Sequence, residues 1–566
     1  MESRTRRDTN RVKFVMSSLL IISLLMITAT AERFRVHITI LSTTDLHGNI
    51  YPIDYNTNKP DARGLARVAT IIKQCRTENT NLLLFDSGDT IQGTPLAFYH
   101  AKIDNKPPDP MMSVMNAIGY DAMAVGNHEF EFGLDKLNKA RSEASFPWLS
   151  ANTYKKGSDE NYFQPFQIKQ VAGVRIGIIG LTTPGMPSLD DPEQYFSKVQ
   201  LREPVSEARK WTNLLRDQHQ VDLVVIVMHM GLEVDLRTGE RYPGQFPGEN
   251  AALAIAEQLP GIDLILMGHT HQEVPSLVIN GVLLIQAEKW GRGVARSDFY
   301  LEKIESSGRW RVVAKSARVI PAGDLVETDQ HILKLAEPYH RDTQAWLDQA
   351  IGESTLELKA GDERFRDTAI LDLVHRVQLD WSGADVSTAM SLNQEARIPK
   401  GTVTVRDIIG LYEYEAVPIV VEVTGRQLKE FLEHSARHFA GYKPDTPVSE
   451  LIDDRYPSYT YDVAEGITYD LDISRPPGDR IQNMRFRGQP VTEKEKLRLC
   501  TITFRANGGA GYTMLKDARV IRRSTKDLRE LIIEWVKRNR SIPIQPTNNW
   551  RLLPVATGGR VIIHSR

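Results

Sequence analysis

The sequence has few cysteines, little excess of charge of either sign and no internal repeat or low-complexity tract. Only Cys75 and Cys500 occur in 566 residues, which allows at most one disulfide. Because the two lie in different predicted domains, we expect free, buried thiols, and a disulfide between them is the less favoured alternative. The formal net charge of −2 argues against a partner that is a nucleic-acid polymer, since such proteins need a basic surface.

Long hydrophobic runs are also missing, apart from one near the N-terminus. Five basic residues precede that run: Arg4, Arg6, Arg7, Arg11 and Lys13. The run covers residues 14–27 and is shorter than the roughly 18 residues of a spanning helix, and Ala29-Thr30-Ala31 follows it as a small-residue cleavage site. Residues 1–31 are therefore predicted to be a cleaved export signal. An uncleaved anchor and twin-arginine export are the alternatives.

Cleavage would remove five basic and two acidic side chains and change the formal charge from −2 to −5. It would leave no stable membrane insertion, and the protein would be periplasmic or extracellular.

Residues 33–326 alternate short apolar runs with polar loops and helical segments. The expected strands, rich in β-branched residues, are RVHITIL, NLLLF, AMAV, VRIGIIGL, DLVVIVM and DLILM. Buried strands that alternate with helices predict an α/β domain with helices covering the sheet.

The rest of the chain has a different pattern of predicted helices and strands. Residues 327–351 have helical spacing around Pro338, which predicts one long connecting helix that the proline can kink. Residues 352–556 then give a helix at TAILDLVHRVQL, a strand at VPIVVEV, a turn at Thr424-Gly425, a helix at RQLKEFLEHSARHF and the glycine-rich RANGGAGY. This predicts a second, α+β domain with its own core.

Side chains of the metal-binding type follow five of the expected strands. They are Asp45 and His47, Asp86 and Asp89, Asn127 and His128, His229, and His269 with His271. Because the carboxyl ends of strands in an α/β sheet gather at one edge, we expect these residues to converge. The spacing in DLH and HTH also places both side chains of each pair on the same side of an extended backbone.

This mixed set of carboxylates, imidazoles and one carboxamide suits Zn, Mn, Co or similar divalent ions rather than a thiolate site. The ligands are too many for one ion, which predicts two. If one carboxylate bridges them, the site stays positive and attracts an anionic substrate. Two ions about 3.5–4 Å apart hold a bridging hydroxide and clamp the oxygens of an in-line phosphoryl displacement. Each motif alone is more often a loop residue, and only the five in order indicate this site.

The motifs resemble two known kinds of domain. TTDLHGN, SGDTIQGTP, VGNHEFEFG, VMHMG and MGHTH are similar to the calcineurin-like dinuclear metallophosphoesterase domain, a four-layer αββα sandwich. TVTVRDIIGLYEYE, VTGRQLKEFLEHSA, ITYDLDIS and RANGGAGY resemble the nucleotide-binding domain of the secreted 5′-nucleotidase family. Within that family, DTAILDLVHRVQL, GADVS and NNWRLLP are most similar to the periplasmic 2′,3′-cyclic-nucleotide 2′-phosphodiesterase/3′-nucleotidase branch.

The resemblance implies roles for single residues of the first domain. One metal ion would be bound by Asp45, His47 and His271, the other by Asn127, His229 and His269, with Asp89 as the bridge. His128 would not be a ligand; with Asn127 it would stabilise the transferring phosphoryl group, or it would help the leaving oxygen. Glu131 stands where the family usually has an aspartate, and its role would be to orient His128.

The resemblance also implies a nucleoside site in the second domain. Tyr414 and Tyr512 match two aromatics that sandwich the base, and stacking of this kind tolerates different bases. Asn393, Arg397 and Asn507 are further candidates to contact the nucleoside. Either tyrosine can instead pack in the core, and Asn507 can simply form a turn with the glycines that follow.

We therefore predict an exported two-metal phosphohydrolase that converts 2′,3′-cyclic nucleotides and 3′-nucleotides to nucleoside and phosphate, with rotation of the second domain carrying the nucleoside to the ions. The alternatives that keep the machinery are a 5′-nucleotidase or UDP-sugar hydrolase and an enzyme for a non-nucleotide anion such as a thiosulfonate. A binding protein without turnover is a further alternative, which the complete ligand set disfavours.

Overall fold

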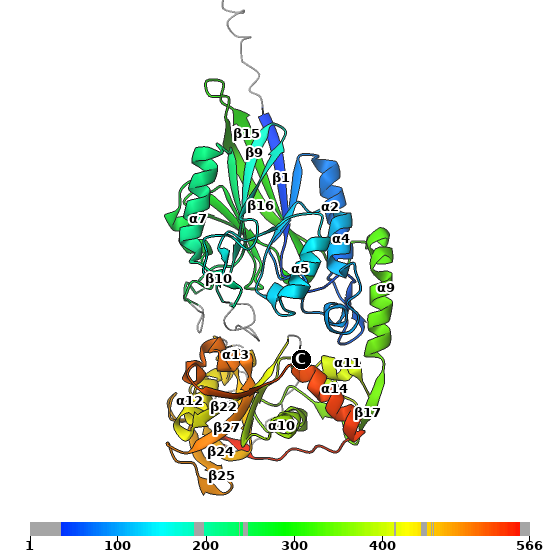
Figure 1. The fold of residues 1–566 in the computed structure, drawn as a ribbon, viewed down its shortest axis with the longest axis vertical. Helices are drawn as coiled ribbons and strands as arrows, with labels where there is room; N and C mark the ends of the chain where they lie inside the picture. The colour runs from blue at the N-terminus through cyan, green and yellow to red at the C-terminus, as the bar shows by residue number, and fades with distance from the viewer. Residues whose placement is uncertain are drawn as a thin grey trace, which may run out of the picture.

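The computed structural model describes residues 35–185, 197–236, 238–241, 247–412, 415–442, 450–453, 455–456 and 458–554. The predicted export signal and Tyr414 lie outside these residues. Figure 1 shows two bodies stacked along the long axis, with α9 (Gln330–Leu347) running down one side towards the second body. Within the described part of the chain, no helix is long and apolar enough to cross a membrane.

Two six-stranded sheets form the centre of the first domain. The first has the order β16 (Trp310–Pro321), β15 (Gly293–Lys303), β1 (Arg35–Thr43), β4 (Leu82–Asp86), β5 (Ala122–Ala124) and β6 (Trp148–Leu149). The second has the order β13 (Val274–Ile279), β14 (Val282–Gln286), β12 (Leu264–Leu266), β11 (Leu223–His229), β9 (Val174–Thr182) and β8 (Phe166–Val171). Apolar side chains from both sheets, such as Ile40, Phe85, Ile178 and Val225, pack against each other in one core.

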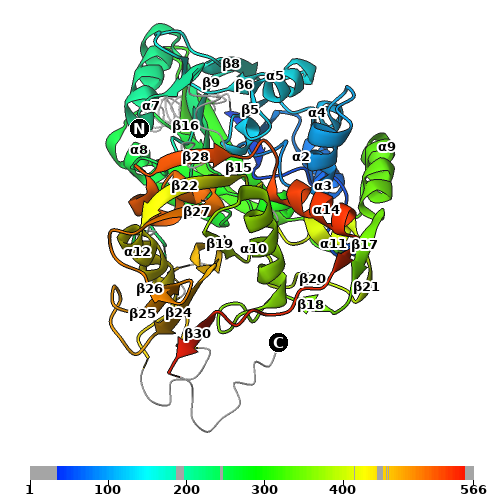
Figure 2. The ribbon, with the colours of Figure 1, turned by 60° about the horizontal axis from the view of Figure 1, so that its bottom comes forward.

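Helices cover the outer faces of both sheets. On one side lie α2 (Leu65–Glu78) and α4 (Pro110–Ile118), and on the other lie α7 (Pro204–Asn213) and α8 (Ala252–Gln258) (α2, α4 and α7 in Figure 1, α8 in Figure 2). The predicted four-layer αββα sandwich is thereby confirmed. All six expected strands are present, and β1, β4 and β5 run parallel to one another, as do β9, β11 and β12. Their carboxyl ends therefore lie at the same edge of each sheet.

The second domain is built on a five-stranded sheet. Its strand order is β23 (Asp462–Glu465), β19 (Val386–Met390), β27 (Lys496–Ile502), β22 (Pro418–Thr424) and β28 (Arg519–Arg523). Two helices flank this sheet (Figure 2): α10 (Ala369–Ser382) packs against β19 and β27, and α12 (Gly425–Ser435) packs against β22 and β23. Cys75 in α2 and Cys500 in β27 are free, buried thiols, as expected.

Two local predictions need correction. Thr424-Gly425 is not a turn between elements, because Thr424 is the N-cap of α12: its side chain accepts from Gln427 N–H, and the Gln427 side chain accepts from Thr424 N–H. The helix predicted over residues 327–351 is shorter at both ends. Asp329 caps its start by accepting from the N–H groups of the first turn, and β17 (Ala350–Ser354) pairs with β21 (Gly401–Thr404) directly after its end.

A buried ion pair lies in the second domain between β23 and the short helix α13 (Thr503–Ala506). The Arg505 guanidinium is fully buried and lies 2.7 Å from the Asp462 carboxylate. The same guanidinium lies 4.4 Å from the centre of the Tyr512 ring. Removal of one partner of such a pair leaves an uncompensated buried charge, which costs far more than an exposed pair does.

We expect Asp462→Ala to lower the free energy of unfolding of the second domain by about 3–5 kcal/mol. Urea-induced unfolding followed by circular dichroism measures this change. Glu422→Ala is the control, because Glu422 pairs with Lys496 at the surface of the same domain. Equal unfolding midpoints for the two variants would contradict the expectation.

Candidate metal centre

The loops after β1, β4 and β12, together with the end of β11, bring six predicted ligands together. They form two triads, Asp45 with His47 and His271, and Asp89 with His229 and His269. Within each triad the possible ligand atoms all lie within 4.8 Å of one another. The seventh predicted ligand, Asn127, follows β5, and its side-chain oxygen is buried without a hydrogen-bond partner. A buried oxygen without a hydrogen-bond partner, on a cavity wall shared with Asp89, fits a site for cations.

The two triads adjoin each other. Asp89 Oδ2 lies 2.9 Å from His229 Nε2 in its own triad and 3.9 Å from His47 Nε2 in the other. Asp45 Oδ1 in turn lies 3.3 Å from His271 Nε2 and 4.0 Å from His229 Nε2. Each carboxylate therefore faces imidazoles of both triads. This arrangement is suited to two neighbouring divalent ions with a carboxylate between them.

Groups behind the imidazoles fix the direction in which each ring points. His47 Nδ1 is 3.0 Å from the carbonyl oxygen of Gln92, and His229 Nδ1 is 2.7 Å from that of Ser87. A carbonyl can only accept, so both Nδ1 atoms donate, and Nε2 of each ring is left for a metal ion. His269 Nε2 instead lies 3.1 Å from Glu249 Oε1, which leaves Nδ1 of that ring.

The ligand loops have unusual backbone conformations. Positive φ angles occur at five of the six triad residues: Asp45 (49°), His47 (45°), Asp89 (57°), His269 (73°) and His271 (56°). Such angles cost energy in residues other than glycine and gather at functional sites. The Glu129 carboxylate, completely buried, helps to hold these loops by accepting from the N–H groups of Gly126 (2.7 Å) and Asp89 (2.9 Å). Asp86 is also structural, since it accepts from the hydroxyls of Thr43 and Thr90.

Two glycines in the motifs are required by close packing. A Cβ atom on Gly126 would lie 2.2 Å from Asp89 Oδ1, and one on Gly268 would lie 2.3 Å from the Thr44 hydroxyl. Both distances are far below van der Waals contact. The glycine of GNHE and that of GHTH therefore allow their loops to approach the carboxylates.

The carboxylates give the centre a negative potential. Burial acts to lower the pKa of His229, but Asp89 and Asp45 outweigh burial and raise this pKa to about 9. Burial lowers the pKa of His47 to about 3, against the opposing effect of Asp89. His47 is thus neutral, as a metal-binding imidazole must be, while His229 carries a proton that a divalent ion would displace.

His128 lies beside the triads, with Nε2 3.9 Å from Asp89 Oδ2. Its Nδ1 is 2.8 Å from Glu131 Oε1. Burial acts to lower the pKa of His128, but Glu131 and Asp89 outweigh burial and raise this pKa to about 10. Glutamate in place of the usual aspartate therefore still reaches the ring, and His128 is a cation that can donate a hydrogen bond.

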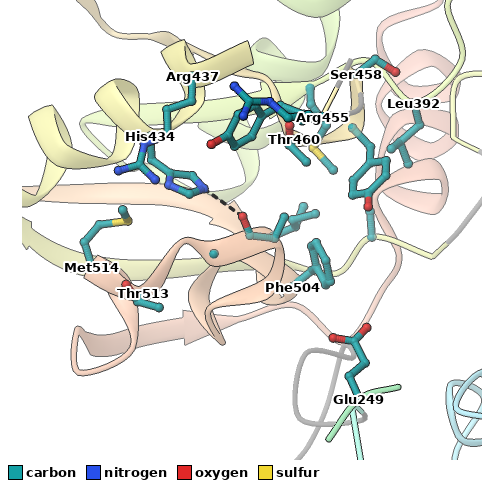
Figure 3. Close-up of a pocket in the computed structure, with 18 of the residues that line it drawn as sticks. Glu249, Leu392, His434, Arg437, Arg455, Ser458, Thr460, Phe504, Thr513 and Met514 are labelled. Atoms are coloured by element: carbon teal, nitrogen blue, oxygen red, sulfur yellow. Dashed lines mark hydrogen bonds between the residues drawn. The ribbon is translucent and has the colours of Figure 1, made fainter. Parts of the chain in front are cut away.

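A cavity of about 1700 Å³ lies between the two domains. Asp89, Asn127 and His128 line it from the first domain. Figure 3 shows residues of the second domain around it, including Leu392, His434 and Phe504, and Glu249 of the first domain on the opposite side.

Four of the predicted nucleoside residues lie in the described part of the chain, and none of the four lines this cavity. Tyr512 is completely buried, with its hydroxyl donating to Thr460 O (2.7 Å) and its ring against Phe431, so its ring is not presented to the cavity. The described lining of the cavity also lacks Asn393, Arg397 and Asn507. Asn393 donates to the carbonyl of Gly410, Arg397 is exposed on β20 (Arg397–Ile398), and Asn507 ends α13.

The sequence analysis overlooked several residues of the site. Phe504 lines the cavity. In the sequence it directly precedes RANGGAGY and lies three residues before Asn507. Glu129 belongs to the quoted GNHE motif, so its position two residues after the predicted ligand Asn127 is visible in the sequence. Glu249 carries no comparable signal, because it is distant in sequence from the histidine it contacts.

Comparisons with known proteins agree with this geometry. Residues 38–273 match the family of calcineurin-like phosphoesterases, and residues 350–517 match the 5′-nucleotidase C-terminal domain. A 2′,3′-cyclic-nucleotide 2′-phosphodiesterase/3′-nucleotidase of Yersinia enterocolitica is 29% identical, over 94% of this chain and 91% of its own length. The structure of a protein assigned as a 5′-nucleotidase from Staphylococcus aureus, in complex with α-ketoglutarate, is 26% identical with a TM-score of 0.81, covering 91% of this chain and all of that one.

A third relative is the trifunctional nucleotide phosphoesterase protein YfkN of Bacillus subtilis. It is 27% identical over 98% of this chain, which spans only 42% of that relative's length. A crystal structure of its calcineurin-like phosphoesterase is 31% identical with a TM-score of 0.50, covering 55% of this chain and 99% of that one.

The chain belongs to the calcineurin-like phosphoesterases that carry a 5′-nucleotidase C-terminal domain. It is a metal-dependent phosphoric ester hydrolase of the nucleotidase and phosphodiesterase type.

We expect the protein, after chelation and dialysis, to bind two Mn²⁺ ions per chain in isothermal titration calorimetry. Asp89→Ala should bind no more than one, because the Asp89 carboxylate faces both triads. His37→Gln is the control, because His37 lies in β1 of the same sheet but pairs with Asp298 away from the triads. Two ions of unchanged affinity in Asp89→Ala would contradict the assignment.

Proposed function

We propose that this protein is an exported nucleotidase that opens 2′,3′-cyclic nucleotides and hydrolyses 3′-nucleotides to nucleoside and inorganic phosphate. The observation that carries the proposal is a cavity between the domains with the two adjacent triads on one side. The second domain forms its other side and contributes the aromatic ring of Phe504. Asp45, His47 and His271 would hold one ion, and Asn127, His229 and His269 the other, with Asp89 between them. The predicted signal over residues 1–31 supports export.

The ions would supply activation of a water and neutralisation of phosphoryl charge when bound. Side chains of the protein would donate the proton and contact the phosphoryl group. His128 is oriented by Glu131 and held as a cation, so its Nε2 can donate to a phosphoryl oxygen as charge develops or to the leaving ribose oxygen. Asn127 and His128 both line the cavity, so the phosphoryl group binds where these side chains face it.

The second domain would bind the nucleoside. Phe504 lines the cavity opposite the metal side and offers a face on which any base can stack (Figure 3). Tyr414, which the resemblance places in the same role, lies outside the described residues but only one residue from Glu415 of the cavity wall. At about 1700 Å³ the cavity exceeds the roughly 300–1000 Å³ typical of ligand sites, so it has room for a nucleotide in more than one orientation.

Two relatives favour different substrates. The Yersinia relative is named for cyclic and 3′-nucleotides and supports the proposed branch. The Staphylococcus structure, with its TM-score of 0.81, supports a 5′-nucleotidase as the second candidate. Both reactions would use the same two triads. They differ in which ester of the nucleotide, the 3′ or the 5′, lies beside the triads.

Phosphate release with added Mn²⁺ or Co²⁺ separates the two candidates. We expect 2′,3′-cyclic AMP and 3′-AMP to be hydrolysed faster than 5′-AMP, with loss of activity in Asp89→Ala. A preference for 5′-AMP would favour the second candidate and leave the metal assignment intact.

We expect Phe504→Ala to raise KM for 3′-AMP by about 5-fold to 150-fold, because stacking of one base contributes about 1–3 kcal/mol. KM for p-nitrophenyl phosphate, which has no base, should change little. Tyr512→Phe is the matched control, since its ring is buried away from the cavity. Equal effects of Phe504→Ala on both substrates would argue against a stacking role.

A further inference from the structure

Glu415 of the second domain makes contacts across the domain boundary. It lies in the segment before β22, and its side chain is 4% exposed. Its carboxylate accepts a hydrogen bond from Gln92 Nε2 of the first domain and also contacts the Glu131 side chain of that domain. Both Glu131 and Glu415 face the cavity. One carboxylate of the second domain therefore touches two residues next to the metal centre.

Each of these two residues holds a histidine of the centre. The carbonyl oxygen of Gln92 accepts from His47 Nδ1 at 3.0 Å. Glu131 Oε1 lies 2.8 Å from His128 Nδ1. The Nε2 atoms of both rings lie 3.9 Å from Asp89 Oδ2. Gln92 thus links Glu415 to His47, a proposed metal ligand. Glu131 links Glu415 to His128, the proposed proton donor.

Arg529 anchors Glu415 in place. It is the second residue of α14 (Leu528–Asn539), is 1% exposed, and lies 2.8 Å from Glu415 Oε1 and 2.9 Å from Asp527 Oδ1. Its guanidinium also lies 4.7 Å from the centre of the Phe98 ring in the first domain. A buried charge with these partners cannot leave them without a large cost. The position of Glu415 is therefore set by the packing of α14 against the first domain.

The charge state of Glu415 is also set by these contacts. Burial acts to raise its pKa, but Arg529, together with the contacts to Glu131 and Gln92, outweighs burial and lowers this pKa to about 2. The carboxylate therefore stays ionised near neutral pH and remains an acceptor for Gln92.

We propose that Glu415 is a positioning residue for the reaction at the metal centre. With the second domain docked as described, it holds Gln92 and Glu131, and through them the rings of His47 and His128. The inference rests on the proposed hydrolytic function. Its consequence is that the second domain does more than bind the nucleoside: its docking completes the arrangement of the reacting groups.

The test compares Glu415→Gln, Gln92→Leu and the double variant in the full chain with Mn²⁺. Glu415→Gln keeps the size of the side chain, and Gln92→Leu removes the same contact from the other domain. The substrates are 2′,3′-cyclic AMP and bis(p-nitrophenyl) phosphate, which has no base. Each single variant should lower kcat by about 10-fold or more on both substrates, as loss of an outer partner of a metal ligand does, with KM changed less than about 2-fold. The double variant should be no worse than the worse single variant.

Glu422→Gln is the matched control, because it removes a carboxylate from the neighbouring strand that pairs with Lys496 at the surface. It should leave kcat and KM unchanged. Melting temperature and Mn²⁺ stoichiometry are measured for every variant, and Gln92→Leu keeps the test open if Glu415→Gln does not fold.

Three results would overturn the inference. Variants with the kcat of the unaltered protein would show that the contact positions nothing. A loss confined to 2′,3′-cyclic AMP would assign Glu415 to nucleoside binding instead. Additive losses in the double variant would show that Glu415 and Gln92 act separately. If the unaltered protein hydrolyses neither ester, the proposed function itself fails, and this inference falls with it.

Discussion

Two buried carboxylates at one sheet edge constrain the rest of the first domain. Asp45 and Asp89 are almost completely excluded from water, and ionised groups in such a position must be compensated by nearby positive charge. The surrounding structure serves this requirement. Parallel strands end at the two carboxylates, carbonyls of Ser87 and Gln92 turn imidazoles towards them, and Glu129 ties down the loops. Divalent cations at the two triads would supply such positive charge.

The cavity joins two walls of different character. On the metal side the groups are buried and closely hydrogen-bonded, whereas the opposite wall combines apolar side chains such as Phe504 and Leu392 with charged ones such as Arg437. Binding energy from the base can therefore be gained at a distance from the phosphorus, where it holds the ester against the reacting groups. A large cavity with separate walls also suits substrates that differ in the position of their phosphate.

The sequence was informative wherever the signal is local. Runs such as DLVVIVM define strands by composition, and the order of DLH, GD, GNHE and GHTH places ligands at strand ends, because parallel strands bring such ends together. The capping box at Thr424 was also present as T-x-x-Q and was misread as a turn. The direction in which a single side chain points could not be predicted from the sequence. Tyr512 and Phe504 flank the same glycines, and only the packing of Phe431 and Asp462 from distant segments decides which ring faces the core. Glu415 likewise gains its partners from α14 and from the first domain.

The left-handed backbone at the ligand positions bears on how such a protein can change over evolutionary time. Five triad residues have backbone conformations that few amino acids other than glycine adopt, and Gly126 and Gly268 leave no room for a side chain, so single substitutions there are seldom tolerated. The opposite wall of the cavity includes side chains on helices, such as Lys429 on α12 and Phe504 on α13, which can be exchanged one at a time. Lineages built on this architecture are thus free to drift in what they recognise while the reaction they perform stays the same.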